Sequence, residues 1–474
     1  MLSFQEDDPK IGMRSIGNAS KVWKKLTASA TSNTADPESF AYSTARERWP
    51  KILSTAIDEI KSTVSKTEGL THDDVHASRQ IIARFTSLKE SMAANALLEP
   101  IPDDGGSDIQ YYNRELQMLN HPTWLATPWL YTECYMYRLI HTFFTTATPF
   151  WKTFDIFVTS KRQSLVSSKK GTIELVKRFR GMLQAIASEE TADDATQKAI
   201  FEEMVQISLW GNATDLSLLT SLSVEELQSR QGKAARESSK ANVVSDDTEA
   251  VRALLSSLRH SNSSGTIHVV LDNAGFELLT DLVFVAYLIE SGYATKVMLH
   301  GKRMPWFVSD VNPGDLTDLI HGFADGTTYQ EIETEDKQEL EEAGKYWQKL
   351  MDTGKMEFQA SPFWTTQHPY GRMAEVNPKL YESLAGADLV VYKGDLNYRK
   401  LTYDGMWPKT TAFKEAIGPL ATKQTGGKGT RSLVLRTCKA DVCVGLEPGM
   451  EEKLPGDWTR TGRYAVVSYC DAKS

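Results

Sequence analysis

The stretch VVLDNAGFELLTDL, residues 269–282, decides the expected fold. It begins with apolar residues, places Asp272 and Asn273 side by side, crosses Gly275 and continues as a mostly apolar run to Ile289. A short apolar run that stops at polar residues before a longer apolar run predicts a buried strand followed directly by a helix. Two oxygen-bearing side chains are therefore expected at the carboxyl end of a strand, facing the start of a helix.

Outward from this stretch, the second half of the chain alternates short apolar runs with helical patterns. The predicted strands are Ile267–Leu271, Lys296–Leu299, Trp306–Val308, Leu389–Tyr392, Leu433–Leu435 and Ala465–Ser468. The predicted helices between them are Phe276–Ser291, Thr334–Thr353 and Pro378–Ala385. Continuous apolar strands separated by helices indicate an α/β fold, with a mostly parallel sheet covered on both faces.

The first half of the chain has helical patterns, as expected of a bundle. The predicted helices are Trp49–Thr63, His76–Leu98, the aromatic-rich Thr127–Phe157, Ile173–Ala187 and Thr196–Leu209. We therefore expect an N-terminal helical bundle over residues 1–205 and an α/β domain over residues 206–474. Residues 223–250 are rich in Ser, Lys and Glu and are predicted to form a polar surface segment.

Composition limits the classes of partner and compartment. The net charge of −9 argues against a nucleic-acid-binding surface, which needs a basic face. No run of about 18 apolar residues predicts a membrane span, and the N-terminus lacks the apolar region of a signal peptide. The four cysteines include no CxxC pair and are typical of reduced thiols inside a cell. The expected location is the cytoplasm, with the nucleus as an additional location.

Polar side chains recur where the predicted strands stop. They are Asp272 and Asn273, then Ser309 and Asp310, then Lys393, Asp395, Asn397 and Arg399, and finally Arg436, Thr437 and Lys439. In open parallel sheets, ligands bind outside the carboxyl ends of the strands. The fold is therefore expected to bring these distant residues to one edge of the sheet.

The residue types at this edge indicate a chemistry. Carboxylate and amide oxygens are hard ligands that suit Mg²⁺ or Mn²⁺, and lysine and arginine side chains bind phosphate. Together they suggest metal-assisted hydrolysis of a phosphate ester. The alternative for a single Asp-Asn pair after a strand is a turn or a helix cap without a ligand.

Several known motifs fail on these residues. A haloacid-dehalogenase phosphatase needs an aspartate where Ala274 stands, and a nucleotide-binding methyltransferase loop needs more glycines than Gly275 alone. The sequence GGKGT at residues 426–430 lacks the spacing of a phosphate-binding loop and is interpreted as a flexible connection. His72 and His76 lack the pattern of a zinc site and are interpreted as part of a solvated helix start.

Longer segments resemble a known family. They are RWPKIL at 48–53, WLYTECYMYR at 129–138, LWGNATDLSLL at 209–219, LDNAGFELLTDL at 271–282, PWFVSD at 305–310, KGDLNYRKL at 393–401 and RTCKADVCVGL at 436–446. On these segments the chain resembles the damage-control phosphatases, the family built on domain of unknown function 89. Within it, the chain is similar to the eukaryotic subfamily III of sugar-phosphate phosphatases, also described as acidic residue methyltransferase 1 proteins.

The resemblance implies a three-layer α/β/α domain with an N-terminal helical bundle. It also implies a divalent metal, typically Mn²⁺ with Mg²⁺, Co²⁺ or Ni²⁺ as alternatives, on Asp272, Asn273 and Asp310. Asp272, Asp310 and Lys439 are the implied catalytic residues. The implied substrate contacts are Asp272, Asn273, Glu277, Asp395, Leu396, Asn397, Tyr398, Arg399 and Lys439. Asn212 and Asp215 are similar to residues that line the family's pocket, although a helix cap explains them equally well.

The family implies hydrolysis of small sugar phosphates such as fructose 1-phosphate and fructose 6-phosphate. The alternative is methyl transfer from S-adenosylmethionine to protein glutamates, which needs a cofactor loop after the strand Ile267–Leu271 instead of metal ligands. Asp272, Asn273 and Asp310 favour the phosphatase. A third reading, in which the helical half binds a protein partner, is less simple than burial of its aromatic side chains against the sheet domain. The expected partner is a small sugar phosphate, without nucleic acid or membrane.

Overall fold

A computed structural model describes residues 31–187, 193–211, 240–422 and 429–473. The described residues form a seven-stranded sheet in the order β1-β7-β6-β5-β2-β3-β4. The strands are β1 (Val243–Asp246), β2 (Thr266–Val270), β3 (Lys296–His300), β4 (Met356–Gln359), β5 (Leu389–Lys393), β6 (Arg431–Thr437) and β7 (Ala465–Asp471). Strands β2 to β6 are mutually parallel. Strand β7 pairs with β6 in the antiparallel direction, and β1 pairs with β7 in the parallel direction.

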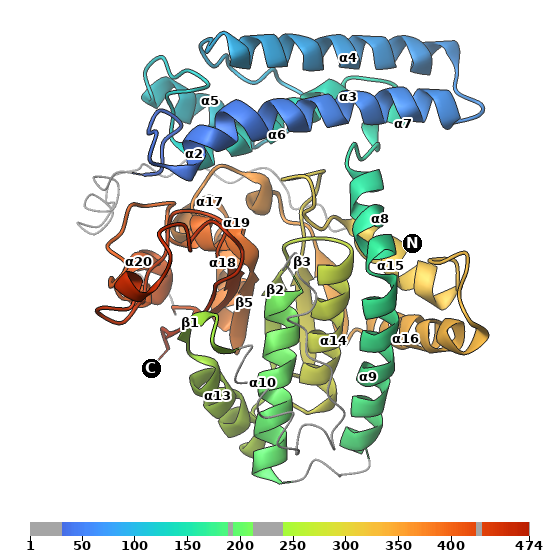
Figure 1. Ribbon diagram of the computed structural model, residues 1–474, viewed down its shortest axis with the longest axis vertical. Coiled ribbons are helices and arrows are strands. Elements are labelled where there is room, and N and C mark those ends of the chain that lie inside the picture. Colours follow the sequence, from blue (N-terminus) through green and yellow to red (C-terminus); the bar gives the residue numbers. More distant parts are fainter. Residues whose placement is uncertain (1–30, 188–192, 212–239, 423–428, 474) are drawn as a thin grey trace.

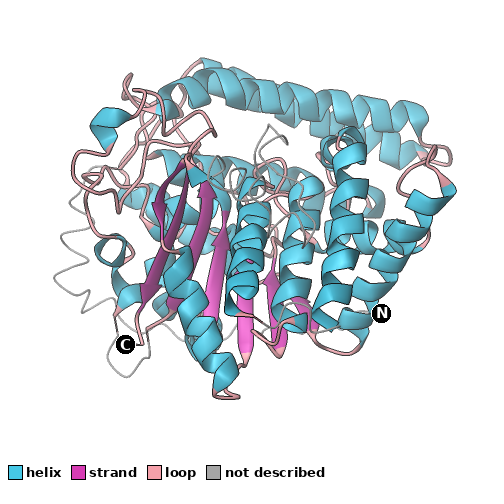
Figure 2. Ribbon diagram, turned by 60° about the horizontal axis from the view of Figure 1, so that its bottom comes forward, coloured by secondary structure: helices cyan, strands magenta, loops and turns pink. Residues whose placement is uncertain are grey.

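Alternate side chains of the central strands pack into different cores. Val269 of β2 and Val391 of β5 face one core, whereas Val270 and Tyr392 face the other. This two-residue period is the property of a strand that is buried on both faces. Helices cover both faces of the sheet (Figure 2), and the α/β/α three-layer prediction is confirmed.

Two sets of helices supply the outer layers. The first core is closed by α8 (Val158–Ser167), α9 (Lys169–Ala187), α10 (Asp194–Trp210), α13 (Thr248–His260), α14 (Phe276–Glu290), α15 (Pro313–Ala324) and α16 (Thr334–Asp352). The second core is closed by α17 (Met373–Val376), α18 (Pro378–Gly386), α19 (Gly394–Leu401) and α20 (Phe413–Ala416).

A separate helical layer lies across the carboxyl ends of the strands (Figure 1). Its helices are α2 (Phe40–Ser43), α3 (Trp49–Lys66), α4 (His72–Ala93), α5 (Ile109–Met118), α6 (Trp129–Thr145) and α7 (Pro149–Lys152). Edge-to-face pairs such as Phe85 with Phe143 fill its core. Trp306, Leu396 and Ala440, which come from the sheet domain, are buried in the same core. The helical layer therefore packs directly on the segments that follow β3, β5 and β6, the second of which is the helix α19.

Some predicted elements differ from the structure. Trp306–Val308 is not a strand but a turn, in which Phe307 and Val308 have positive φ. An apolar run predicts that a segment is buried but not what covers it. Here the run is buried against the helical layer and does not pair in the sheet. Strands β1 and β4 were missed because each is short and mixes apolar with charged residues. Within the predicted polar surface segment 223–250, residues 243–246 form the edge strand β1, and residues 223–239 lie outside the described residues.

The predicted domain boundary falls inside a helix. Residues 205 and 206 lie within α10, whose buried side chains share the core of α14 and the sheet. Among residues 31–205, the last one buried in the core of the helical layer is Phe157. Packing thus favours a division nearer residue 157, and the two-domain organisation itself stays a prediction. None of the described helices is long and apolar enough to cross a membrane, and all four cysteines are buried and free.

Candidate active site

The loops after β2 and β3 lie side by side at the carboxyl end of the sheet. The Ala274 amide donates to the Ser309 carbonyl at 2.7 Å, and the Val311 amide donates to the Asp272 carbonyl at 2.9 Å. Asn273 and Asp310 form an antiparallel bridge between these two bonds. The backbone thus brings together the three residues predicted to bind metal, Asp272, Asn273 and Asp310.

The Asn273 amide connects the acidic groups of the site. Its Nδ2 donates to Asp272 Oδ2 at 2.9 Å and to Glu277 Oε2 at 2.7 Å, and its Oδ1 accepts from the Ser309 hydroxyl. Glu277 lies in the first turn of α14, which begins after Gly275 with φ 74°. Asp272, Asn273 and Glu277 therefore form one hydrogen-bonded group.

Lys302 is a site residue that the sequence did not reveal. Its Nζ lies 3.2 Å from Asp310 Oδ2 and 3.3 Å from the Leu271 carbonyl, and its side chain is only 1% exposed. A lysine two residues after a strand is normally read as a solvated loop residue, because lysine is seldom fully buried without a partner. The partner here is Asp310, eight residues further along the chain.

Burial disfavours the charged form of both aspartates. It raises the pKa of Asp272 well above its ordinary value, and the nearby charges of Glu277 and Asp310 raise it further. Burial also raises the pKa of Asp310 to about 6, although the Lys302 ammonium opposes this effect. Two buried carboxylates with incomplete compensation form a site that a cation would stabilise.

A second buried lysine, Lys393, forms an ion pair with Glu277. Lys393, the last residue of β5, lies with its Nζ 2.7 Å from Asp281 Oδ1 and 3.3 Å from Glu277 Oε1. The Ser208 hydroxyl also donates to Asp281, at 2.7 Å. Lys393 was predicted to be a phosphate-binding candidate, but its contacts assign it to the support of α14 and α10.

Gly394 allows Asp272 to occupy its position. Its φ is 79°, and a Cβ built there would lie 1.8 Å from Asp272 Oδ2. Both the backbone conformation and the space therefore require glycine. Gly394 explains why β5 ends in KGD and not in a larger residue.

We expect Gly394→Ala to reduce phosphate release about 10- to 100-fold, since displacing a reacting group by about 1 Å has effects of this size. The measurement is kcat/KM for a sugar phosphate, with the folded fraction determined by circular dichroism. Gly386→Ala is a suitable control, because a Cβ at Gly386 meets nothing within 4 Å. Unchanged activity of Gly394→Ala would show that the position of Asp272 is not critical.

Asp395 and Lys439 meet across β5 and β6. Asp395 Oδ1 accepts from Arg436 Nε at 2.8 Å and from the Lys439 amide at 3.1 Å. The half-buried Lys439 side chain lies close enough to Asp272 for its charge to lower the pKa of that carboxyl. The structure thus places Asp395 and Lys439 near Asp272. Arg436 is fully buried, and its hydrogen bond fixes the position of the Asp395 carboxylate.

Other residues of the KGDLNYRKL segment point into the protein. They lie in α19 and not in an open loop, so successive side chains face different directions. Asn397 binds the Lys393 carbonyl at 2.6 Å, and the Tyr398 hydroxyl accepts from the Val444 amide at 2.9 Å. Leu396 is buried in the core of the helical layer. These three residues shape the site through packing in this structure, and direct contact with substrate stays a prediction.

Arg399 is also committed to protein contacts. Its guanidinium donates to both oxygens of Asp404 at 3.0 and 3.1 Å and to Glu133 Oε2 at 3.1 Å, and it stacks 3.6 Å from the Trp129 ring. Those contacts join α19 to α6. The Arg399 guanidinium is bound to Asp404 and Glu133 in this structure, and its direct contact with substrate stays a prediction. Asn212 and Asp215 lie outside the described residues.

The donor set at this site fits a divalent cation. Asp272 and Asp310 are buried carboxylates, and the Lys302 ammonium, 3.2 Å from Asp310 Oδ2, does not offset the effect of burial on the pKa of Asp310. Within the described part of the chain, no group of three or more His, Cys, Asp or Glu residues is arranged to hold a metal. The predicted set has two carboxylates and the Asn273 amide, a set that leaves room for water and substrate oxygens around Mg²⁺ or Mn²⁺.

Fold and site together define a class. An α/β/α protein with buried carboxylates at the carboxyl ends of parallel strands has the arrangement of α/β proteins whose ligands bind at that edge of the sheet. The chain belongs to the damage-control phosphatase ARMT1-like family, whose domain description matches residues 44–454.

Three relatives illustrate the extent of the similarity. The chain is 34% identical over 456 residues to the human damage-control phosphatase ARMT1, with 92% of this chain and 97% of the human protein covered. The mouse protein of the same name is 33% identical over 451 residues, with 92% and 97% covered. The zebrafish protein is 33% identical over 448 residues, with 91% and 94% covered.

A solved structure is similar in outline only. The crystal structure of a DUF89 family protein from Pyrococcus horikoshii covers 90% of this chain and 97% of its own, at 15% identity and a TM-score of 0.39. The assignment to the family rests on the sequence matches.

Proposed function

We propose that the protein is a metal-dependent phosphatase of small sugar phosphates, with fructose 1-phosphate and fructose 6-phosphate as typical substrates. The observation that carries the proposal is the pair of buried carboxylates, Asp272 and Asp310, beside the cationic Lys439 and Lys302. A phosphate dianion would be repelled by Asp272 and Asp310 alone. A bound cation would reverse that repulsion, and Mn²⁺ is the proposed ion, with Mg²⁺, Co²⁺ or Ni²⁺ as alternatives.

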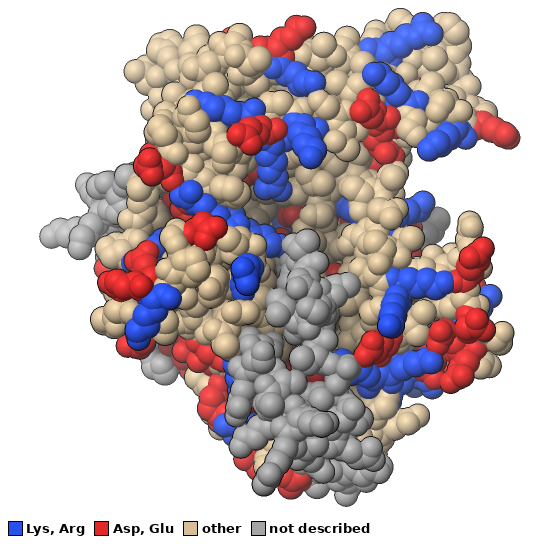
Figure 3. All heavy atoms as spheres, in the orientation of Figure 1, with Lys and Arg blue, Asp and Glu red and all other residues tan. Residues whose placement is uncertain are grey.

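Each residue has a proposed task. Asp272, Asn273 and Asp310 would hold the metal, which supplies Lewis-acid polarisation of the phosphoryl group and an acidified water. Lys439 would pair with the phosphate, and Asp395 orients the Lys439 backbone through the 3.1 Å bond described above. Lys302 fixes the Asp310 carboxylate through its 3.2 Å contact. Figure 3 shows Lys and Arg side chains, with Asp and Glu side chains among them, on the face below the helical layer.

The alternative, methyl transfer from S-adenosylmethionine, has less support in the geometry. Gly275 is the one glycine in the loop after β2, and a Cβ built there would lie 3.1 Å from the Lys161 carbonyl of α8. This glycine accommodates a neighbouring helix. A cofactor loop would instead use it to approach the ribose and methionine of the ligand.

We expect phosphate release from fructose 1-phosphate to stop when metal is removed by EDTA and to return when Mn²⁺ is added. The same preparation should be assayed for methyl transfer with labelled S-adenosylmethionine. Fructose without phosphate and glucose 6-phosphate serve as controls for background and for substrate choice. Methyl transfer that resists EDTA and is faster than every phosphate-release reaction would contradict the proposal.

A further inference from the structure

The loop between β3 and α15 carries both Lys302 and Asp310, and its two ends are closed on each other. The Lys302 amide donates to the Val311 carbonyl at 2.7 Å, and the Gly301 amide donates to Gln359 of β4 at 3.1 Å. The base of the loop is therefore part of the sheet edge. Its tip, residues 303–308, lies outside this hydrogen-bonded frame and must be held by other contacts.

The tip has a backbone conformation that its own residues disfavour. Phe307 has φ 46° and Val308 has φ 73°. A positive φ is costly for a β-branched residue such as valine, and it persists only when surrounding contacts enforce it. The Asp310 amide donates to the Trp306 carbonyl at 3.1 Å, so the position of the tip is passed directly to a proposed metal ligand.

The contacts that hold the tip come from the helical layer. Trp306 is fully buried in the core of that layer, and the Phe307 ring stacks on Tyr137 of α6 with centroids 4.8 Å apart. Arg303, next to Lys302, donates to Asp108 Oδ1 at 2.7 Å. The helical layer thus contacts both ends of the tip, at Arg303 and at Phe307.

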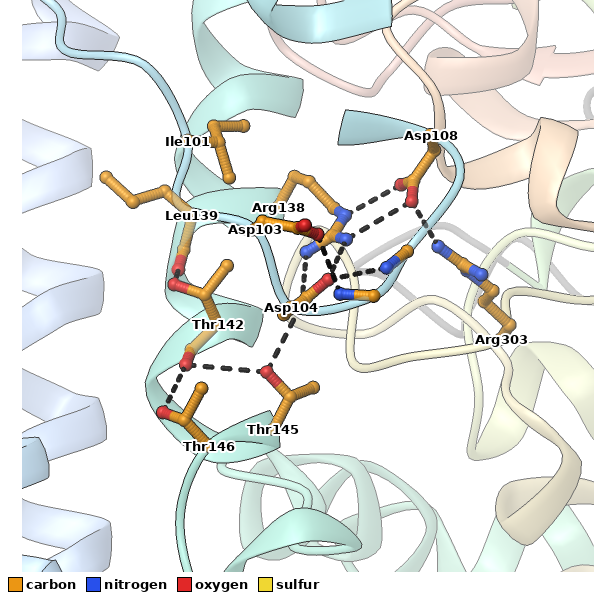
Figure 4. Close-up of polar contacts among 12 residues, drawn as sticks. Ile101, Asp103, Asp104, Asp108, Arg138, Leu139, Thr142, Thr145, Thr146 and Arg303 are labelled. Carbon is orange, nitrogen blue, oxygen red and sulfur yellow. Dashed lines mark hydrogen bonds and ion pairs between the residues drawn. The ribbon is translucent and has the colours of Figure 1, made fainter. Parts of the chain in front are cut away.

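Asp108 is in turn fixed by a buried charge cluster (Figure 4). Arg138 of α6 donates from Nε to Asp108 Oδ2 at 2.7 Å, and from its two terminal nitrogens to both oxygens of Asp104 at 2.8 Å. Thr145 also donates to Asp104, at 3.2 Å. Arg138, Asp104 and Asp108 have side-chain exposures of at most 3%, whereas Arg303 is 28% exposed.

We infer that Arg303 is a positioning residue for the metal site, through which the Arg138 cluster of the helical layer sets the geometry of Lys302 and Asp310. The inference rests on the proposed metal dependence. Arg303 does not reach substrate or metal in this account. It acts by holding the loop whose next residue, Lys302, contacts Asp310 and whose strained tip is bonded to the Asp310 amide.

The test is the Mn²⁺ affinity of Arg303→Ala, measured by calorimetry without substrate. Loss of the grip on the loop should weaken Mn²⁺ binding about 10-fold or more, the effect typical of residues that orient metal ligands. A simple field effect has the opposite sign, because removing a positive charge near an acidic site strengthens cation binding. Arg303→Lys, which keeps a charged donor, should recover part of the affinity.

Arg180→Ala is the matched control. Arg180 has a side-chain exposure of 27% and pairs with Glu339 at 2.6 Å, between α9 and α16. The substitution removes an equally exposed arginine whose partners, Glu339 and Glu342, lie on α16, but Arg180 has no link to the loop of Asp310, so Mn²⁺ affinity should be unchanged. Turnover at saturating Mn²⁺ gives a second readout, since a loosened Asp310 lowers kcat with little change in KM.

The outcomes separate the two proposals. If wild-type protein binds no Mn²⁺ or other divalent ion, the proposed function fails and the inference fails with it. If wild type binds Mn²⁺ and Arg303→Ala binds it equally or more tightly with unchanged kcat, only the positioning role is overturned. If Arg303→Ala proves too unstable to assay, Asp108→Glu, which keeps the charge but shifts the carboxylate, provides the same comparison with the same expected weakening, and unchanged affinity there overturns the role.

Discussion

Asp272→Asn is expected to abolish phosphate release, by about 10³-fold or more, while raising the melting temperature of the metal-free protein. The loss follows from removing one of two proposed metal carboxylates, a larger change than the loss of a single stabilising donor. The gain follows from burial and from the charges of Glu277 and Asp310, which together raise the pKa of Asp272. The substitution should therefore separate catalysis from stability in opposite directions.

The stability effect follows from the direction in which burial moves the pKa of Asp272. A carboxyl whose pKa is higher in the folded protein than in the unfolded chain binds its proton more tightly when folded. Its contribution to stability is present below the unfolded pKa, near 4, and is lost as pH rises through the folded pKa. Above the unfolded pKa, ionisation of Asp272 favours the unfolded chain, and a neutral asparagine of the same shape removes that effect while still accepting the Asn273 Nδ2 hydrogen bond.

Thermal unfolding in EDTA and in Mn²⁺ checks this expectation. Wild type should gain stability on addition of Mn²⁺, because a ligand that binds only the folded state stabilises it. Asp272→Asn should begin at a higher melting temperature in EDTA and gain little from Mn²⁺. Asp318→Asn is the control, since Asp318 is an exposed carboxylate with a side-chain exposure of 61%. A variant that is less stable than wild type in EDTA would contradict the account of Asp272.

The central part of the site could be predicted because the rule for parallel sheets is simple. Strands β2 and β5 and their polar ends follow from apolar runs, and carboxyl ends of parallel strands meet at one edge. That reasoning placed Asp272, Asn273, Asp310, Asp395 and Lys439 together without any knowledge of side-chain contacts. It worked for Asp310 even though the preceding segment, Trp306–Val308, is a strained turn instead of the predicted strand.

The remainder depends on helix phase and on distant packing. KGDLNYRKL was interpreted as an open strand end, but it forms α19, and a helix distributes neighbouring side chains around its axis. Asn397 and Arg399 consequently face the core, where Tyr370 and Glu133 are their partners. Lys302 was missed because its burial depends on how the loop after β3 folds back on Asp310 and on the end of β2, and no local pattern predicts that contact.

Lys439 and Arg399 allow a contribution to substrate binding to be separated by experiment from a contribution to stability. Lys439 is half-buried, and its charge acts on Asp272, whereas Arg399 is 3% exposed and bound to Asp404 and Glu133. The first side chain can reach a ligand beside Asp272. The second would have to break three hydrogen bonds and leave the Trp129 ring to do so.

Lys439→Ala is therefore expected to lower kcat/KM for a sugar phosphate about 10²- to 10³-fold, the scale observed when one preorganised electrostatic group is lost. Its thermal stability should stay close to that of wild type and of the exposed control Lys453→Ala. Arg399→Met should instead lower the free energy of unfolding by about 3–5 kcal/mol, because Asp404 and Glu133 would remain buried without their cation. Steady-state kinetics on the three variants measure the loss of kcat/KM, and denaturant unfolding measures the loss of stability. If Arg399→Met is stable but inactive, with Lys439→Ala fully active, the phosphate-binding role belongs to Arg399, and the substrate must reach α19 by displacing it from Asp404.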